Sequence, residues 1–369
     1  KCFQVRMNNV VFRVDSSQTI GFGHLMRCLI LAKGLRNKGV KVSFLTREHS
    51  GNFNNYIINQ GFKIYFLPSS SYKKSLLKEY EKWLSTTQEI DANESINIIK
   101  NKEIDWLIVD HYAIDETWEK KLKPHVKKIM VIDDLANRKH FCNLLFDQTY
   151  GRSISAYRKL TPKKCEYLLG SENALLRPDF LELRQAAIDR RKNYQSLKHI
   201  LISLGSLDTS NYTQLLLDII ELIEWKELPI VNIVLTSQSK NLNHLRQILT
   251  KYKYKVNLLV DVENMAELML RSDLAIGSGG ISSWERCCMG LPAILIILAD
   301  NQKSIGENLS SAGATITLKD DINMGQNIKQ SIEYLMQDRE SYEKMSLNAS
   351  KICDGNGLQR TVNKIFQNN

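Results

Sequence analysis

The amino-acid sequence predicts an α/β protein built from two Rossmann-like, doubly wound domains that face a cleft. The chain has 369 residues, more than a single hydrophobic core usually serves, so two domains are expected. In both halves, short runs rich in β-branched residues alternate with longer helical patterns, as they do in the βαβ units of a parallel sheet. Glycines and polar residues follow several of these runs, at the strand ends where doubly wound sheets bind their ligands.

The first half predicts an N-terminal domain over residues 7–190. A helix is expected over residues 24–37, and another helical pattern follows Pro178. That second pattern leads into a polar, basic stretch at residues 191–196, where we expect the junction between the domains. Strand patterns occupy residues 10–15, 42–46, 63–67, 106–110 and 129–133.

The second half predicts a C-terminal domain over residues 197–369 that ends in a helical tail. Helical patterns at residues 328–336 and 358–366 belong to this tail, which in a two-domain protein can cross back onto the first domain. Strand patterns occupy residues 200–204, 231–236, 256–260, 274–277 and 293–298.

The composition is that of an ordinary globular protein, with 43% hydrophobic and 24% charged residues and without a low-complexity tract or a repeat. The formal net charge is +10, but Lys and Arg are scattered and often stand beside Glu. Because no nucleic-acid-binding motif accompanies them, we expect no nucleic-acid partner. A mildly basic protein suits an anionic diphosphate substrate.

The sequence also bears on location and on metals. No run approaches the ~20 apolar residues that span a bilayer, and no signal-peptide arrangement stands at the start, so we expect a cytoplasmic protein without membrane insertion. The seven cysteines are odd in number and include no CxxC pair, which argues against a disulfide framework or a zinc site. We expect no metal and no other cofactor. Residues 1–6 precede the first strand pattern, and we assign them no function.

The first candidate site follows the first predicted strand, which ends in Asp15. Gly21 and Gly23 would allow a tight turn and a close approach to a ligand, and the helix that begins at His24 offers backbone N–H donors to an anion. A histidine here could be a catalytic base whose ring Asp15 orients, or it could simply cap the helix or lie on the surface. The two glycines alone are a weak signal.

Two further candidates follow strands of the same predicted domain. Asp110, His111 and Tyr112 end an apolar strand, where they could bind substrate, or the Asp could cap the next helix. Asp133 and Asp134 end another strand. Because adjacent strand residues point to opposite faces and no third ligand is near, we expect a structural or substrate-orienting role for this pair, not a metal site.

In the second predicted domain, a glycine-rich turn enters a helix. The N–H groups of Gly279 and Gly280 and the hydroxyls of Ser282 and Ser283 would form a cradle for a diphosphate, and Glu285 could accept hydrogen bonds from a ribose. The spacing is not GxGxxG, which disfavours NAD binding.

Two other strand ends of this domain carry polar residues. Gly205 and Ser206 follow the strand at residues 200–204, and we include them in the expected nucleotide site. Asn301 and Gln302 follow the strand at residues 293–298, and their amides could contact a base or a sugar. Asn301 could equally be the N-cap of the next helix.

Seven segments, taken together, resemble one family. The family is that of the UDP-2,4-diacetamido-2,4,6-trideoxy-β-L-altropyranose hydrolase of pseudaminic acid biosynthesis and its spore-coat-polysaccharide relatives. It resembles the glycosyltransferase-B fold, in which the C-terminal domain holds UDP. In the family's order, the segments are DSSQTIGFGHLMRC, IVDHYAID, VIDDLANR, LLGSENALLRPDF, ISLGSLDTSN, GSGGISSWERCCMGLP and LADNQ.

The resemblance implies metal-independent hydrolysis of a UDP-sugar at the anomeric carbon, with release of UDP and a free diacetamido sugar for a surface-polysaccharide pathway. It implies that His24 is the general base, that Tyr112 assists at the sugar, and that Glu285 and Asn301 lie on the nucleotide or substrate side. The segment at residues 205–208 departs from the family pattern in lacking a second glycine. The tail beyond residue 302 is also longer than compact members need.

Two other functions are compatible with the sequence. A glycosyltransferase that moves the sugar to an acceptor would share the fold and the UDP site, and a non-catalytic protein would bind a UDP-sugar without turnover. The GFGH and DHY segments favour hydrolysis, and no basic amphipathic or apolar patch suited to a lipid acceptor stands out in the predicted N-terminal domain. The sequence leaves the stereochemistry of the sugar and the oligomeric state open.

Overall fold

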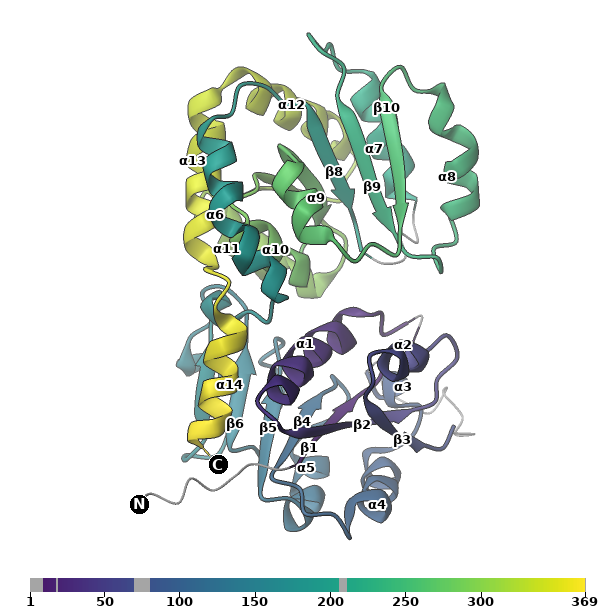
Figure 1. Cartoon of the computed structure of the whole chain (residues 1–369), viewed down its shortest axis with the longest axis vertical. Coiled ribbons are helices and arrows are strands. Elements are labelled where there is room, and N and C mark those ends of the chain that lie inside the picture. Colours follow the sequence, from purple (N-terminus) through teal and green to yellow (C-terminus); the bar gives the residue numbers. More distant parts are fainter. Residues whose placement is uncertain (1–8, 18, 70–79, 206–210, 369) are drawn as a thin grey trace. The chain divides into compact units, whose positions relative to one another are not determined.

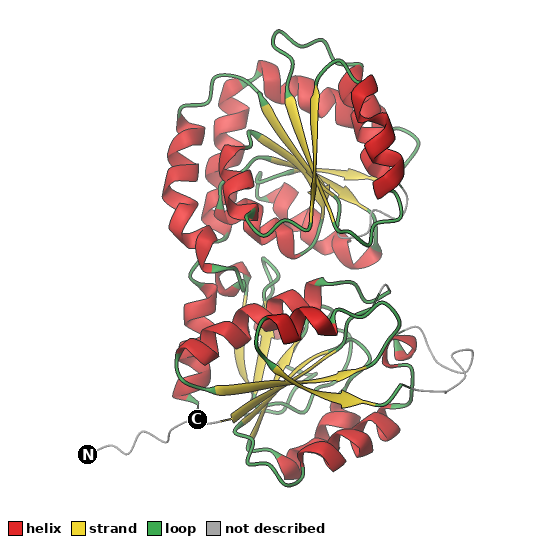
Figure 2. Ribbon diagram, turned by 45° about the vertical axis from the view of Figure 1, so that its right-hand side comes forward, coloured by secondary structure: helices red, strands yellow, loops and turns green. Residues whose placement is uncertain are grey.

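The chain forms two compact units, each with its own parallel sheet (Figure 1). The computed structural model describes residues 9–17, 19–69, 80–205 and 211–368. Unit 1 comprises Lys1–Leu175 and Asn356–Asn369, and unit 2 comprises Leu176–Gly355. Helices flank the sheet of each unit (Figure 2). The predicted pair of doubly wound α/β domains is thereby confirmed.

Within the described residues, unit 1 has a seven-stranded sheet in the order β3-β2-β1-β4-β5-β6-β7, and the pairings are parallel. The strands are β1 (Asn9–Val14), β2 (Lys41–Arg47), β3 (Lys63–Leu67), β4 (Trp106–Asp110), β5 (Lys128–Ile132), β6 (Leu144–Asp147) and β7 (Glu166–Leu169). The α-helices are α1 (Gly23–Asn37), α2 (Asn54–Asn59), α3 (Glu81–Leu84), α4 (Gln88–Ile99), α5 (Glu116–Leu122) and α14 (Gly357–Gln367).

The alternation of side chains along β1 explains why this strand lies at the centre of unit 1. Val10, Phe12 and Val14 pack into one hydrophobic core on one face of the sheet. Val11 packs into a second core, together with Leu107. Both faces of a parallel sheet are covered by helices, so a nearly continuous apolar strand is stable there.

Unit 2 has a six-stranded sheet in the order β10-β9-β8-β11-β12-β13 among its described residues, again with parallel pairings. The strands are β8 (His199–Ser203), β9 (Ile230–Leu235), β10 (Lys255–Val260), β11 (Leu274–Ser278), β12 (Ala293–Ile297) and β13 (Ile316–Lys319). The α-helices are α6 (Pro178–Lys192), α7 (Tyr212–Glu221), α8 (Leu242–Ile248), α9 (Met265–Arg271), α10 (Ile281–Cys288), α11 (Lys303–Ser311), α12 (Met324–Gln337) and α13 (Arg339–Ile352).

The strand patterns read from the sequence coincide with strands of the two sheets, but three strands were not predicted. These are β6, β7 and β13, which have four residues each. A run of four residues is too short to show an alternation of apolar and polar side chains, and its β propensity carries little weight against its surroundings.

The expected domain boundaries, 7–190 and 197–369, are displaced in the structure. Helix α6 belongs to unit 2, where it packs on α9, α10 and α13, so the stretch at residues 191–196 lies inside that unit. Helix α14 crosses back and packs on α1 of unit 1. A glycine permits this close packing, because a Cβ at Gly34 would lie 2.8 Å from Leu358 Cδ1.

Candidate active site

A tight turn brings the start of α1 to the carboxyl end of β1. Gly21 has a φ of +80°, a conformation that glycine adopts without steric cost, and its N–H donates to the carbonyl of Ser17 at 2.8 Å. The Ser17 hydroxyl also accepts a hydrogen bond from the N–H of Ile20 at 3.0 Å. Helix α1 then begins at Gly23, so His24 lies in its first turn.

His24 is paired with Asp110, the last residue of the neighbouring strand β4. The distance from His24 Nδ1 to Asp110 Oδ1 is 2.7 Å, and the carboxylate side chain is fully buried. Arg27 Nη2, which can only donate, also lies 3.1 Å from Nδ1, but the contact with the carboxylate is shorter. Because a carboxylate can only accept, we assign the proton to Nδ1 and the lone pair to Nε2. Nε2 has no recorded partner in the described part of the chain, and 12% of the side chain is exposed. The ring therefore has the geometry of an oriented base.

Arg27, one helical turn after His24, holds the same carboxylate. Its Nε and Nη2 each donate to an oxygen of Asp110 at 2.6 Å, and its Nη1 donates to Asp134 at 3.2 Å. Burial alone would raise the pKa of Asp110, but the charges of Arg27 and His24 hold that pKa well below its usual range. Asp110 therefore stays ionised, and it can stabilise an imidazolium at His24.

Tyr112 lies against the His24 ring and is fixed by Asp134. Its ring meets that of His24 edge-on, with centroids 4.6 Å apart, and its hydroxyl donates to Asp134 Oδ1 at 2.6 Å. Burial and the nearby Asp134 charge raise the pKa of Tyr112 well above its usual value, so the phenol is neutral. The structure thus brings His24 and Tyr112 together, and it shows contacts to Asp110 and Asp134 that the sequence analysis did not assign to these two strand-end aspartates.

Asp15 does not orient His24, contrary to expectation. Its carboxylate binds the Arg13 guanidinium, with contacts of 2.5 and 2.9 Å, and accepts the N–H of Arg47 at 2.7 Å. The Nε2 atoms of His49 and His111 lie 3.3 and 3.1 Å from Asp15 Oδ2. Asp15 is therefore the centre of a buried ionic cluster beneath the strand ends.

His111 is also a buried structural residue. Its side chain is 1% exposed, Nδ1 accepts the N–H of Ala113 at 3.1 Å, and Nε2 faces Asp15. Burial lowers its pKa, although the Asp15 carboxylate opposes that shift. A direct contact between His111 and a substrate is therefore not compatible with its position.

The pair Asp133 and Asp134 divides as the sequence suggested. Asp133 is buried and binds Arg138 at 2.7 Å and the Tyr157 hydroxyl at 2.9 Å, which is a structural role. Asp134 turns the other way, toward Tyr112, and its side chain is 24% exposed. Among the described residues, no group of three or more His, Cys, Asp and Glu side chains could hold a metal ion.

In unit 2, the two glycines in the turn between β11 and α10 differ in the space around them. A Cβ at Gly280 would meet nothing within 4 Å, whereas a Cβ at Gly279 would lie 3.2 Å from the Cβ of Gln302. Gly279 must therefore be small for Gln302 to pack against it. Gly205, which has a φ of +108° after β8, has no described atom within 4 Å of the place where a Cβ would stand, and Ser206 lies outside the described residues.

The two serines of this turn have different roles. Ser283 is buried, and its hydroxyl accepts the N–H of Gly280 at 3.2 Å and that of Arg286 Nη2 at 3.0 Å. The bond from Gly280 is part of the N-terminal cap of α10, and together the two bonds occupy the Ser283 hydroxyl, so the expected contact between Ser283 and a diphosphate is not supported. Ser282 remains partly exposed, and its hydroxyl accepts a 3.3 Å hydrogen bond from Arg286 Nη1.

Arg286 is a residue of this region that the sequence did not reveal. It is buried, donates to the carbonyl of Ser278 at 2.8 Å, and would contact any side chain at position 277, where a Cβ would stand 2.6 Å from its Nη1. Burial lowers the pKa of Arg286 to about 10. The guanidinium is therefore packed beneath the glycine turn, where it holds the backbone at Ser278.

The remaining predicted residues of unit 2 lie near the same strand ends. Glu285 is partly exposed, and burial raises its pKa against the opposing charges of Arg177 and Arg286. Gln302 uses its Oε1 to accept the N–H of Leu298 at 3.0 Å, so this amide stabilises the loop. Asn301 belongs to a short 3-10 helix, and its side chain lies outside the description.

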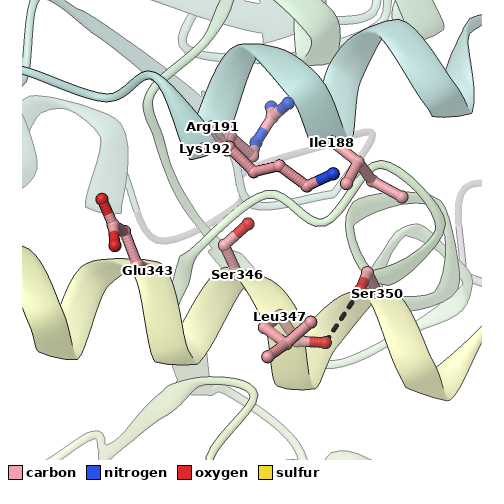
Figure 3. A pocket seen from close by; sticks show the side chains of 7 residues that line it. All are labelled: Ile188, Arg191, Lys192, Glu343, Ser346, Leu347 and Ser350. Carbon is pink, nitrogen blue, oxygen red and sulfur yellow. Dashed lines mark hydrogen bonds between the residues drawn. The ribbon is translucent and has the colours of Figure 1, made fainter.

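A cavity of about 250 Å³ lies elsewhere in unit 2, between α6 and α13 (Figure 3). It contains none of the predicted site residues. Its lining mixes the apolar Ile188 and Leu347 with the polar Ser346 and Ser350, and Ser350 donates its hydroxyl to the carbonyl of Leu347 (Figure 3). We assign no chemistry to this cavity.

Comparison with known proteins gives relatives over most of the chain. The chain is 30% identical over 312 residues to the UDP-2,4-diacetamido-2,4,6-trideoxy-β-L-altropyranose hydrolase of Campylobacter jejuni, a match that covers 84% of this chain and 99% of the relative. It is 23% identical over 363 residues to the spore coat polysaccharide biosynthesis protein SpsG of Bacillus subtilis, with 94% and 95% covered. Residues 199–360 match the glycosyltransferase family 28 C-terminal domain.

Solved structures agree on the fold. MurG of Acinetobacter baumannii matches with a TM-score of 0.71 over 98% of this chain and 99% of that chain, at 16% identity. Os79 of O. sativa in complex with UDP matches with a TM-score of 0.65 over 97% and 99%, at 12% identity. The two Rossmann-like units thus form a fold of the glycosyltransferase-B type.

No helix within the described ranges is long and apolar enough to cross a membrane.

Identity of 30% across nearly the whole length of the C. jejuni enzyme agrees with the seven sequence segments that resemble its family. The chain belongs to the family of the UDP-2,4-diacetamido-2,4,6-trideoxy-β-L-altropyranose hydrolases.

Proposed function

We propose that this protein hydrolyses a UDP-linked diacetamido trideoxy sugar at its anomeric carbon and releases UDP and the free sugar for nonulosonic (pseudaminic-type) acid biosynthesis. The observation that carries the proposal is the pairing of His24 with buried, ionised Asp110, which leaves His24 Nε2 without a protein partner among the described residues. The hydrolase named for the C. jejuni relative supports the same reaction.

In the proposed reaction, His24 Nε2 takes a proton from a water molecule as the water oxygen attacks the anomeric carbon. The bond from that carbon to the UDP oxygen breaks, and its electron pair leaves with UDP. Asp110 accepts the Nδ1–H throughout and stabilises the imidazolium without taking the proton itself, since Arg27 keeps it ionised. A general base in this role contributes about 10²- to 10⁴-fold to the rate.

Unit 2 would hold the nucleotide. The N–H group of Gly279 and the partly exposed Ser282 hydroxyl are suited to the diphosphate, and Gly280, whose own N–H is held by Ser283, leaves room for it to approach. Glu285 lies one turn into the helix, and we propose that it accepts a hydrogen bond from a ribose hydroxyl. These donors and the positive end of the helix would offset the charge that develops on the departing UDP, so we propose that hydrolysis needs no metal ion.

A second candidate is transfer of the sugar to an acceptor hydroxyl in place of water. The match of residues 199–360 to a glycosyltransferase C-terminal domain favours it. The same His24 would then remove the acceptor's proton. The two functions differ in whether UDP is released when no acceptor is present.

The test is UDP release from a panel of UDP-diacetamido sugars in oxygen-18-labelled water, without any added acceptor. We expect UDP and free sugar in equal amounts, with no label in UDP because the carbon–oxygen bond breaks, and NMR of the fresh product will give its anomeric configuration. Release that requires an acceptor would establish the transferase. Formation of UMP and a sugar phosphate would contradict both candidates.

A further inference from the structure

Three aromatic rings stand together beside His24 in unit 1. Trp83, on α3, stacks on Tyr112 with centroids 5.2 Å apart and an angle of 22° between the planes. Tyr80 meets both of these rings edge-on at 5.4 Å. His24 in turn meets Tyr112 at 4.6 Å and Trp83 at 5.9 Å, both edge-on. We call the group formed by Tyr80, Trp83 and Tyr112 the aromatic wall.

The aromatic wall is partly buried in the core and partly exposed. Leu84, the residue after Trp83, is fully buried, and so is nearly all of Tyr112. Trp83 and Tyr80 keep part of their surface exposed. An indole ring held in place by its neighbours, yet still partly exposed next to a base, is typical of a surface that binds a ligand.

The indole N–H of Trp83 belongs to a partly exposed ring, unlike that of Trp106, which also has no acceptor among the described residues but is fully buried. Trp118 donates its N–H to Asp91 at 2.8 Å, and Trp225 donates to the carbonyl of Ile220 at 3.1 Å. The Trp83 N–H has no recorded acceptor within the described residues. The wall therefore offers an apolar face together with the Trp83 N–H as a donor.

We propose that the aromatic wall determines sugar specificity: it packs against the methyl group at C6 of a 6-deoxy sugar, and the Trp83 N–H donates to an acetamido carbonyl. The assignment rests on the proposed function for the identity of the sugar. A hydroxyl at C6 would lose water against the ring faces of the wall, a cost that a methyl group does not have. An apolar surface of this kind discriminates by about 10- to 100-fold.

The experiment compares two synthetic ligands that differ only at C6: the UDP-diacetamido-trideoxy sugar and its analogue with a C6 hydroxyl. Dissociation constants are measured by calorimetry in a His24→Asn background, so that turnover does not consume the ligand. We expect the 6-deoxy ligand to bind about 10- to 100-fold more tightly. Adding Trp83→Ala should reduce this ratio to about threefold or less, and Trp83→Phe, which keeps a ring, should retain most of it.

Trp225→Ala is the matched control, because it removes a partly buried tryptophan of unit 2 and should leave the ratio unchanged. UDP itself should bind equally to all variants. A ratio that survives Trp83→Ala, or a loss of affinity that is equal for both sugars and for UDP, would overturn the proposal. Hydrolysis of the 6-deoxy ligand by the unmodified protein is measured separately. If the affinity ratio is as expected but no hydrolysis occurs, only the proposed reaction is contradicted. If the 6-deoxy ligand does not bind at all, both proposals are overturned.

Discussion

Replacing Asp110 by asparagine should inactivate the proposed base while costing measurable stability. The Asp110 side chain is fully buried and accepts one hydrogen bond from His24 and two from Arg27, all at 2.6–2.7 Å. An asparagine keeps the shape but has one oxygen and a donor in place of the second. Its NH₂ group can donate to His24 Nδ1, which moves the imidazole proton to Nε2 and removes the lone pair needed for water.

The size of each effect follows from these contacts. Removing one partner of a buried pair costs about 3–5 kcal/mol. Arg27 keeps its bond to Asp134 at 3.2 Å, so we expect the lower end, about 3 kcal/mol. For a domain of this size each kcal/mol lowers the melting temperature by roughly 2–4 °C. Turnover should fall by about 10²- to 10⁴-fold, because the wrong tautomer is present.

The pH dependence of this loss has a definite sign. The pKa of Asp110 is held well below its usual range by Arg27 and His24 although burial opposes that shift, so the folded protein binds this proton less readily than the unfolded chain. The stability from Asp110 is therefore fully present above about pH 4, the pKa of an unfolded Asp, and is lost as the pH falls below it. The melting difference between the unmodified protein and Asp110→Asn should shrink over that range.

The assay is UDP release together with thermal unfolding, with Asp105→Asn as the matched control. Asp105 precedes the other end of β4 and pairs with Lys127 at 2.7 Å, so its replacement should lower stability without changing the turnover of folded enzyme. Normal turnover in folded Asp110→Asn would refute the oriented-base reasoning. Equal losses of turnover in both variants would show that the effect is only one of stability.

Further predictions concern the cap, the nucleotide, the metal and pH. Ser283→Ala should cost about 1 kcal/mol because it removes the cap at Gly280, with UDP affinity unchanged in calorimetry; a large loss of affinity would place Ser283 at the diphosphate. Glu285→Ala should weaken UDP binding about tenfold, and an unchanged affinity would remove it from the ribose. EDTA should leave turnover intact, and rescue of EDTA-treated enzyme by magnesium would argue for a metal. Burial lowers the pKa of His111, so the unfolded chain takes up this proton first and the free energy of unfolding should decline below about pH 6.5. Urea unfolding of His111→Gln should show a shallower decline, and an unchanged slope would be inconsistent with this assignment.

The sequence predicted the sheets well because apolar runs and helical periods are local features. The strand at residues 10–15 and the helix at residues 24–37 are β1 and α1 with bounds shifted by one residue. The placement of α14 could be given only as a possibility, because it depends on long-range packing between Leu358 and the gap left by Gly34. No local pattern carries that information.

The partner of His24 could not be chosen from the sequence either. Val14, just before Asp15, pairs in register with Asp110, so both carboxylates stand at the same edge of the sheet near the histidine. Arg13 determines which carboxylate pairs with His24, because it lies two residues before Asp15, on the same side of the chain, and binds the Asp15 carboxylate. Asp110 is left to His24 and Arg27. A signal for Arg27 existed in its spacing of three residues from His24, whereas Trp83 stands in no recognisable motif.

The measurement that tests the central claim most directly is the turnover of His24→Asn and His24→Phe. Both variants should fold normally and keep UDP affinity, since the proposed nucleotide site lies in unit 2. UDP release should fall by about 10²-fold or more, the loss expected when a general base is removed. Near-normal release by a folded, UDP-binding variant would contradict the assignment of His24 as the base.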